Sequence, residues 1–340
     1  MTSRYEQAGV SIDAGLKAVS LMKEAINKTH DSNVLNGVGA FGGLFSLGDK
    51  LKNITQPTLI ASTDGVGTKV ILAAALNQYN TIGHDIVNHC LNDMLCAGEN
   101  IQPLFFLDYV ASSKLRPRMI AETVTGMAEA CQASGLALLG GETAEMPGVY
   151  QPTEFDVVGT IVGLIDQKAI YPRPTMQVGD LLLGLPSSGP HTNGYSLIRH
   201  IFRYTPLHAE YEEIGLLGEA LLAPHRAYLP ELTALKSAGV VVQAIAHITG
   251  GGLVENVPRA LYDFDDLTVR IDRKSWPTPP LFELIQHKGK VDNMEMLRVF
   301  NCGIGMVIII PANQAELALT TVDDGRIIGQ VIQGKEIEWV

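Results

Sequence analysis

Three acidic residues stand where an α/β protein could hold a metal ion. Asp64 follows the apolar run TLIAST, Glu142 follows LALLGG, and Asp93 lies in CLND within a helical pattern. Asp64 and Glu142 end predicted strands beside glycine, the edge at which α/β folds gather their ligands. Such hard oxygen ligands suit Mg²⁺, which takes one or two carboxylates plus substrate phosphates. Each acid alone could equally be an N-cap or Asx-turn residue, so the prediction of a Mg²⁺ site rests on the three together.

The segment 61–69, ASTDGVGTK, combines Asp64 with two glycines and Lys69. It is not a Walker loop, because its glycines and lysine do not have the G-x-x-x-x-G-K-[ST] spacing. A cation held by Asp64 would offset the phosphate charge that the carboxylate itself repels. Lys69 would add a fixed positive charge. The segment therefore predicts phosphate binding assisted by a cation.

Three further glycine-rich turns can present backbone N–H groups to anions: 37–43, 187–194 and 248–252. The second and third run into predicted helix N-termini, where anions bind well. One such turn usually means only a tight loop, but together with the acids and the lysine they predict a multi-phosphate site. His191 in the second turn and His247 just before the third are candidates for acid–base chemistry.

The remaining polar candidates are weaker. We expect most of the nine histidines to be structural or surface residues and assign no function to His84, His89, His200 and His287. Asp108 and Tyr109 end a predicted strand and are candidates to line a site, although a buried tyrosine with a satisfied hydroxyl is the more common case.

The elements that must position these residues alternate between helices and strands. Hydrophobic periodicity and turn residues mark them. In the first half, helices are predicted at 11–28, 67–78, 84–98 and 118–134, and strands at 103–111, 136–143 and 155–165. In the second half, strands are predicted at 180–185, 240–247, 267–271 and 305–311, helices at 194–202, 253–261 and 281–289, and a helix–strand pair at the end. The proline-containing segment 168–179 places a domain boundary, which predicts domains at 1–170 and 171–340.

Composition narrows the class of protein. The chain has 340 residues, 46% of them hydrophobic and 18% charged, as in a well-buried α/β enzyme. Its net charge of −11 makes nucleic acid and anionic membranes poor partners. The N-terminus lacks the apolar region of a signal peptide, and the cysteines form no Cys-x-x-Cys pair, so we expect reduced thiols and a cytoplasmic enzyme. The cysteines are Cys90, Cys96, Cys131 and Cys302.

Eight segments in this order resemble the phosphoribosylformylglycinamidine cyclo-ligase family, the aminoimidazole ribonucleotide synthetases. They are GVGAFGG, TDGVGTK, ND, PLFFLDY, GGETAEMPG, SSGPHTNGYSL, ITGGGLVENVPR and FNCGIGM, and they cover nearly the whole chain. The resemblance implies an α/β (α+β) protein of two domains: an N-terminal domain for ATP, Mg²⁺ and dimerisation, and a C-terminal α/β sandwich. It also implies a homodimer in which the N-terminal sheets pair into a shared barrel, with each site near that interface.

The activity implied by the resemblance is that of an ATP-dependent ligase, EC 6.3.3.1, of de novo purine biosynthesis. Formylglycinamidine ribonucleotide and ATP would give aminoimidazole ribonucleotide, ADP and phosphate. In the family the formyl amide oxygen is activated by phosphorylation, and the amidine nitrogen then closes the ring. Mg²⁺ is expected and K⁺ is a possible second cation.

The resemblance also assigns residues. The metal ligands are Asp64, Asp93 and Glu142, and the catalytic residues are His191, His247 and Lys69. ATP would be bound by Lys23, Gly37, Gly39, Gly42, Gly43, Asp64, Gly65, Gly67, Thr68 and Lys69. The ribonucleotide would be bound by Ser188, Gly189, His191, Asn193, Thr249, Gly250 and Gly251.

One segment departs from the family. MLCAGENIQ, at 94–102, is longer than the usual link, and we place it in a loop near the dimer barrel. Among related enzymes, a selenophosphate synthetase would need a reactive cysteine or selenocysteine in GVGAFGG, a glutamine-dependent synthetase would be much longer, and thiamine monophosphate kinase shares only the wider ATP-binding pattern. A catalytically silent nucleotide-binding scaffold should have lost Asp64, Lys69, Asp93 or Glu142, and all four are present.

Overall fold

The computed structural model describes residues 4–340, so the first three residues of the predicted 1–170 domain lie outside it. The chain forms two compact units. Unit 1 comprises the chain up to Met94 together with Gln102–Leu164, and unit 2 comprises Leu95–Ile101 and Ile165–Val340. Among the described residues, no helix is long and apolar enough to cross a membrane.

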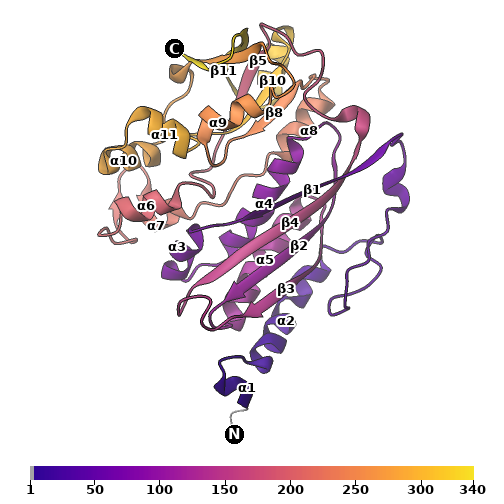
Figure 1. Cartoon of the computed structure of the whole chain (residues 1–340), viewed down its shortest axis with the longest axis vertical. Helices are drawn as coiled ribbons and strands as arrows, with labels where there is room; N and C mark the ends of the chain where they lie inside the picture. Colours follow the sequence, from indigo (N-terminus) through magenta and orange to yellow (C-terminus); the bar gives the residue numbers. More distant parts are fainter. Residues whose placement is uncertain (1–3) are drawn as a thin grey trace. The chain divides into compact units, whose positions relative to one another are not determined.

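Unit 1 is built on a four-stranded sheet of order β1-β4-β2-β3 within residues 4–340 (Figure 1). β2 runs parallel to β3 and antiparallel to β4. The strands are β1 (Pro57–Gly65), β2 (Gln102–Ser112), β3 (Ala137–Glu145) and β4 (Phe155–Asp166). The helices are α1 (Arg4–Gln7), α2 (Ile12–Asn27), α3 (Lys69–Leu76), α4 (Asn80–Leu95) and α5 (Pro117–Ala133), with a 3₁₀ turn, η1, at Gly48–Leu51.

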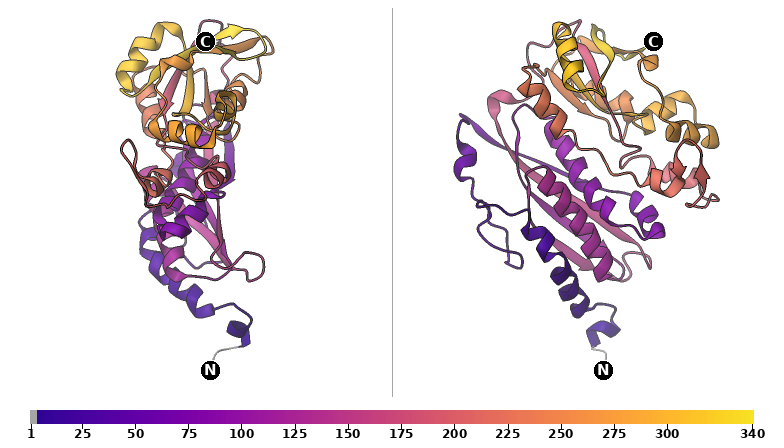
Figure 2. Two further views of the ribbon diagram at one scale, coloured as in Figure 1. Left: turned by 90° about the vertical axis from the view of Figure 1, so that its left-hand side faces the viewer. Right: turned by 180° about the vertical axis from the view of Figure 1, so that it is seen from behind.

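The two faces of this sheet have different surroundings. Helices α4 and α5 cross one face, as the view from behind in Figure 2 shows. Side chains that alternate onto that face, such as Phe106, Val157 and Ile161, are fully buried. On the opposite face Leu107 and Leu59 remain 36% and 65% exposed. Unit 1 therefore covers one face of its sheet with its own helices and leaves apolar side chains on the other.

Helices are present at all four places predicted for this half, although the one predicted at 84–98 spans Asn80–Leu95, and the predicted end of β3 is wrong. The strand was expected to stop at the glycines near residue 143, whereas it continues to Glu145. Gly141 lies opposite Asp108 of β2, and a Cβ at this glycine would be 2.0 Å from Asp108 Oδ1. The glycine therefore permits close pairing of β2 and β3 instead of ending the strand.

Unit 2 contains a six-stranded sheet of order β12-β9-β11-β5-β10-β8 and a two-stranded sheet, β6-β7, within the described chain. The strands are β5 (Leu181–Pro186), β6 (Glu210–Tyr211), β7 (Gly215–Leu216), β8 (Ala244–His247), β9 (Leu267–Ile271), β10 (Ile304–Ile310), β11 (Arg326–Gln333) and β12 (Glu338–Trp339). The helices are α6 (Tyr195–Ile201), α7 (Leu217–Leu221), α8 (Leu229–Ser237), α9 (Gly252–Arg259), α10 (Pro280–Gly289), α11 (Asn293–Val299) and α12 (Ala315–Thr321). Short 3₁₀ turns are η2 (Gln167–Ala169), η3 (Arg273–Ser275) and η4 (Ala312–Gln314).

β10 lies in the core of unit 2, next to the edge strand β8. All seven of its residues are buried, and it pairs antiparallel with both β5 and β8. The predicted strand at 240–247 is correct only for Ala244–His247. The N–H of Val241 donates to the side-chain oxygen of Gln314 instead of to a neighbouring strand. The apolar segment that suggested a strand therefore begins before the hydrogen-bonded strand β8 does.

The link 95–101, which we predicted to form a loop near a dimer barrel, belongs to unit 2. The N–H of Glu99 donates to Ala169 O at 2.8 Å, and the N–H of Tyr171 donates to Ala97 O at 2.9 Å. The Glu99 carboxylate also pairs with Arg173. The longer link is thus fastened to the segment that follows β4.

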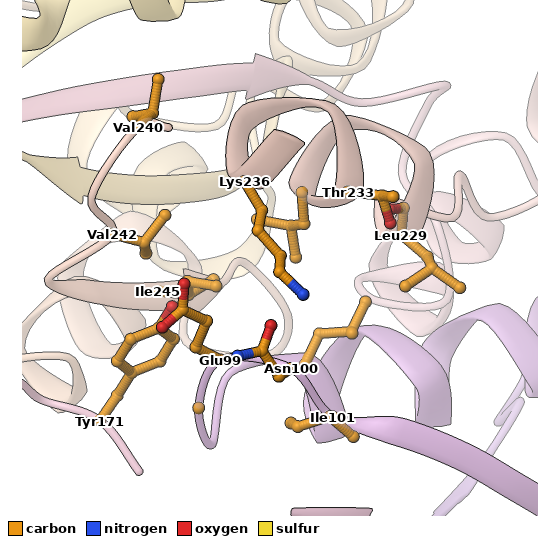
Figure 3. Close-up of a pocket in the computed structure, with 13 residues that line it drawn as sticks. Glu99, Asn100, Ile101, Tyr171, Leu229, Thr233, Lys236, Val240, Val242 and Ile245 are labelled. Carbon is orange, nitrogen blue, oxygen red and sulfur yellow. The ribbon is translucent and has the colours of Figure 1, made fainter. Parts of the chain in front are cut away.

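This link also forms one wall of a cavity of about 120 Å³ (Figure 3). Lys236 of α8 points toward Asn100 across it, and Tyr171, Val242 and Ile245 supply apolar walls. Ligand pockets usually measure about 300–1,000 Å³. The cavity is therefore too small for a nucleotide.

Candidate active site

Asp64 and Asp93 meet at one imidazole. His89 Nε2 lies 2.9 Å from Asp64 Oδ2 and 3.8 Å from Asp93 Oδ2. Asp64 comes from the end of β1, and His89 and Asp93 lie one turn apart on α4, which places them on the same helix face. The His89 side chain is 5% exposed, whereas those of Asp64 and Asp93 are 39% and 33% exposed. Two carboxylates thus reach solvent around a buried ring.

The surroundings of His89 favour its protonated form. Burial of the ring opposes protonation, whereas the hydrogen bond to Asp64 and the negative charge of Asp64 favour it. The charges of Asp93 and Asp85 act in the same direction, so the pKa of His89 is raised above its usual value. His89 was assigned no function from the sequence. Its spacing of four residues from Asp93 on a predicted helix was the available signal.

Asp64 also makes a local contact. Its Oδ1 accepts a hydrogen bond from the N–H of the next residue, Gly65, at 2.7 Å, whereas an Asx turn would bond the N–H two residues on. Gly67 follows at φ +67°, a left-handed conformation that favours glycine, and Thr68 is the N-cap of α3. The glycines of TDGVGTK thus shape the turn from β1 into α3.

Lys69 does not face solvent. It is fully buried, and its Nζ lies 2.8 Å from Asp85 Oδ1 of α4, also fully buried. Burial lowers the pKa of Lys69, while the charge and hydrogen bond of Asp85 act against that effect. This arrangement differs from the predicted phosphate-facing lysine. In this conformation the ammonium group is part of a buried ion pair that joins α3 to α4.

Glu142 is separated from the other two acids. Glu142 lies on β3 and Asp64 lies on β1, and these two strands form opposite edges of the sheet. Three strand spacings, or about 14 Å, therefore separate them. Glu142 is exposed and pairs in register with Tyr109, whereas Asp64 turns toward α4. A single chain therefore does not bring the three predicted metal ligands together.

Beside Glu142, Asp108 has an unusual protonation equilibrium. Desolvation raises the pKa of Asp108 to about 7, backbone hydrogen bonding opposes the shift, and the charge of Glu142 adds to it. Tyr109 donates a hydrogen bond to Met146 Sδ at 3.2 Å, so its hydroxyl is satisfied within unit 1. Asp108 of β2 thus lies beside the strand that carries Glu142, and its raised pKa falls near neutral pH.

The N-terminal ATP-binding candidates lie on exposed segments. Lys23 is exposed on α2, and the glycines at 37, 39, 42 and 43 are exposed in the loop that follows. Asn36 ties the ends of this loop by donating to Gly42 O and accepting from the N–H of Leu44 at 2.8 Å. Backbone hydrogen bonds, such as that from the N–H of Leu35 to Leu44 O at 2.9 Å, also hold the ends of the loop together.

In unit 2 the two predicted substrate turns lie next to each other. A Cβ on Gly250 would be 3.2 Å from Asn193 Oδ1, which places the turn after β8 against the turn that carries Ser188 and Gly189. Asn301 fastens the second turn by donating to Gly189 O at 2.8 Å. The structure thus brings SSGPHTNG, ITGGG and FNCGIG together, as expected for segments that share one site.

His191 and His247 also come together, through a third histidine that the sequence did not single out. His225 Nε2 and His247 Nε2 are 2.9 Å apart, and the rings of His191 and His225 stack with centroids 3.9 Å apart. The three side chains are at most 5% exposed. His191 Nε2 accepts from the N–H of Ser188 at 3.3 Å. The two acid–base candidates thus belong to one buried imidazole cluster.

Matches to two family models and similarity to solved structures define the class of this protein. Residues 49–165 match the N-terminal domain of AIR synthase related proteins, and residues 177–340 match the C-terminal domain. The hydrogenase maturation protein HypE of E. coli has a similar fold, with a TM-score of 0.66, 17% identity, and coverage of 97% of this chain and 94% of HypE. Thiamine-monophosphate kinase from Stenotrophomonas maltophilia gives a TM-score of 0.65 and 15% identity, with 94% and 95% coverage. The predicted two-domain mixed α/β fold is confirmed.

Curated relatives define the family within this class. A phosphoribosylformylglycinamidine cyclo-ligase of Desulfitobacterium hafniense is 48% identical over 93% of this chain and 91% of its own length. One of Lachnoclostridium phytofermentans is 44% identical over 98% of both chains, and one of Geobacillus thermodenitrificans is 45% identical over 100% and 98%. The chain belongs to the phosphoribosylformylglycinamidine cyclo-ligase family, which confirms the predicted resemblance.

Proposed function

We propose that this chain is an ATP-dependent cyclo-ligase that converts formylglycinamidine ribonucleotide into aminoimidazole ribonucleotide, ADP and phosphate in de novo purine biosynthesis. The observation that carries this function is identity of 44–48% to cyclo-ligases over nearly the whole chain. The likeness to thiamine-monophosphate kinase, at 15% identity, concerns the fold alone. The site geometry is compatible with the ligase reaction.

Asp64 and Asp93 are the proposed Mg²⁺ ligands. Both carboxylates approach one imidazole nitrogen and are partly exposed, so a hard cation and a phosphate could reach them. When bound, Mg²⁺ would neutralise charge on the phosphates of ATP. His89 fixes the orientation of Asp64 through Nε2, in the way that a neighbouring group orients a metal ligand. We assign ATP and Mg²⁺ to the N-terminal domain on this basis, with Lys23 and the 37–43 loop as its nucleotide contacts.

The proposed chemistry has two steps. The formyl amide oxygen of the substrate attacks the γ-phosphorus of ATP, and ADP leaves. The amidine nitrogen then attacks the activated carbon, loses a proton and closes the ring as phosphate leaves. His191 and His247 are the proposed groups that accept and return protons, since both lie where the two glycine turns of unit 2 meet. These turns would hold the ribonucleotide phosphate through their backbone N–H groups.

Lys69 has a different proposed role in this conformation. Its ammonium group holds Asp85 of α4, and α4 carries His89 and Asp93. We propose that this ion pair fixes α4 against the TDGVGTK turn. Contact of Lys69 with a phosphate would first require the ion pair to open.

We also propose a homodimer formed through the open face of the unit 1 sheet. The exposed Leu59 and Leu107 on that face support the proposal, since apolar side chains on an uncovered sheet favour packing against a second sheet. Pairing of two such sheets would form the predicted barrel and would give Glu142 a way to approach a site from the partner's side. Leu107→Lys should shift the protein from dimer to monomer in sedimentation experiments, whereas Lys168→Ala should leave the dimer intact.

A reaction that consumes ATP and a phosphorylated purine precursor is consistent with a cytoplasmic location, which we propose for this enzyme. The function is tested by following aminoimidazole ribonucleotide and ADP together, with and without Mg²⁺ and with K⁺ or Na⁺. We expect equal amounts of both products, only when Mg²⁺ is present. Formation of ADP without ring product would point to a kinase, and the absence of both products would favour a silent nucleotide-binding protein.

A further inference from the structure

The cluster of His191, His225 and His247 has the composition of a transition-metal site. One nitrogen from each ring lies within 4.8 Å of a nitrogen from each of the other two, and all three residues are buried. A tetrahedral zinc ion with Zn–N bonds of about 2.0–2.1 Å needs ligand nitrogens roughly 3.4 Å apart. That value lies between the 2.9 Å that separates His225 Nε2 from His247 Nε2 and the 4.8 Å within which the three nitrogens lie. To complete the site, the stacked rings of His191 and His225, whose centroids are 3.9 Å apart, would have to separate and turn toward a common centre.

The three imidazoles are held by separate parts of unit 2. His191 lies at φ +60°, a left-handed conformation that non-glycine residues rarely adopt. His247 ends β8 and pairs with Met306 of β10. His225 precedes Arg226, whose guanidinium pairs with Asp324 at 2.7 Å. Such fixed positions lower the entropic cost of binding an ion.

The neighbouring strand also leaves space for the rings. A Cβ on Gly305 of β10 would lie 2.6 Å from His191 Cε1 and 2.0 Å from the Tyr228 hydroxyl. Tyr228 in turn donates to Pro186 O at 2.9 Å. The glycine thus allows the imidazole cluster to pack directly on the core strand, where apolar residues occupy the other positions of β10.

We infer that His191, His225 and His247 form a binding site for a zinc-type divalent transition-metal ion in unit 2. Neutral imidazole nitrogens select zinc, cobalt, nickel or copper over Mg²⁺, which prefers oxygen ligands. This site is therefore distinct in chemistry from the carboxylates Asp64 and Asp93 of unit 1. A fourth ligand position would be taken by water or another small molecule.

A bound metal ion should also change the activity of the enzyme, an expectation that rests on the proposed function. His191 and His247 are the proposed acid–base groups, and a metal ion would occupy ring nitrogens that otherwise exchange protons. Zinc should therefore slow ring closure, and a chelator should restore it. The ion would act as an inhibitor of this site instead of as a catalytic cofactor.

The inference is tested by titrating the full chain with Co²⁺ in the absence of substrate and recording the visible absorption of a tetrahedral cobalt site. We expect one equivalent to bind with a Kd of about 10 μM or tighter, to resist a large excess of Mg²⁺ and to be displaced by Zn²⁺. His225→Gln should weaken this binding by about 100-fold. His200→Gln, which changes an exposed histidine on α6, is the matched control and should bind as the unmodified chain does.

The measurement does not depend on turnover, so it separates failure of the metal site from failure of the cyclo-ligase assignment. If the unmodified chain gives no tetrahedral band, or if the band persists at full affinity in folded His225→Gln, the inference is wrong. Should His225→Gln fail to fold, Zn²⁺ must still raise the melting temperature of the unmodified chain and Mg²⁺ must not. An equal response to both ions would also contradict the site.

Discussion

His89 in unit 1 and His225 in unit 2 each have a ring nitrogen 2.9 Å from a polar partner, but the partners differ. The partner of His89 is the carboxylate of Asp64, and that of His225 is the imidazole of His247. In the first pair an imidazolium and a carboxylate attract each other. In the second, one ring must donate a proton and the other must accept it, because two imidazolium rings at this distance would repel each other.

This difference shows how one chain can provide two kinds of polar site. The carboxylates around His89 are partly exposed and offer hard oxygen ligands to a cation and its phosphates. The imidazoles around His225 are buried and offer nitrogen ligands or sites for proton exchange. Changes that remove charge should therefore affect unit 1 most, and changes that remove a ring nitrogen should affect unit 2 most.

Asp64→Asn should have the largest effect. The substitution keeps the shape of the side chain but removes the charge that would hold Mg²⁺, so Mg²⁺-dependent turnover should fall about 10²-fold or more. Turnover is measured as aminoimidazole ribonucleotide formed over a range of Mg²⁺ concentrations. Asp49→Asn removes an exposed carboxylate that pairs with exposed Lys52 and is the control. Full activity of Asp64→Asn would contradict the metal assignment.

His89→Gln should have a smaller effect on the same assay. Glutamine can still donate a hydrogen bond to Asp64 but carries no charge, so Asp64 would be less firmly oriented. Loss of such a supporting contact typically costs about 10–100-fold in activity or metal affinity, and we expect the lower end. The loss should appear mainly as a higher Mg²⁺ requirement. His84→Gln, which changes a partly exposed histidine of α4 that pairs with Glu129 of α5, should retain the original requirement if the effect is specific to His89.

The positions of most elements could be predicted from the sequence, because their apolar periodicity is strong. The helices at α2 and α5 and the buried strands β2, β4 and β10 follow that periodicity. The short helix α11 was missed although Asp292 is its N-cap and accepts from the N–H groups of Met294 and Glu295. A helix of seven residues gives too short a periodic pattern to stand out.

The site was harder to predict because its contacts join distant parts of the chain. TDG and ND identified Asp64 and Asp93, but the imidazole between them depends on how α4 packs beside the end of β1. The burial of Lys69 similarly depends on Asp85, sixteen residues away. Glu142 was grouped with Asp64 because both follow apolar runs and end predicted strands beside glycine, whereas strand order places them at opposite edges of the sheet. Strand order is set by tertiary pairing and cannot be read from local pattern alone.

Asp108→Asn should change the pH dependence of stability by a modest amount. Desolvation raises the pKa of Asp108 to about 7, so between its usual value near 4 and pH 7 the unfolded chain releases a proton that the folded chain retains. Folding stability should therefore decrease as pH rises through this range. Asparagine removes the titration and should raise the melting temperature at pH 8, relative to pH 5, by on the order of a few degrees. An unchanged difference between the two pH values would contradict the raised pKa.

The smallest expected effect is a shift in one titration, and it tests the contrast between the two histidine pairs directly. The Asp64 carboxylate contributes to the raised pKa of His89, so Asp64→Asn should lower that pKa toward or below the usual value of about 6.5. Because the folded pKa is raised, the stabilisation from His89 is present in full below that usual value and is lost as pH rises through the folded pKa. Histidine ring signals in ¹⁵N NMR spectra would report the midpoint, with His287 as an internal reference. A His89 midpoint that does not move in Asp64→Asn would mean that the carboxylate does not control this ring, and the proposed contrast with His225 would then fail.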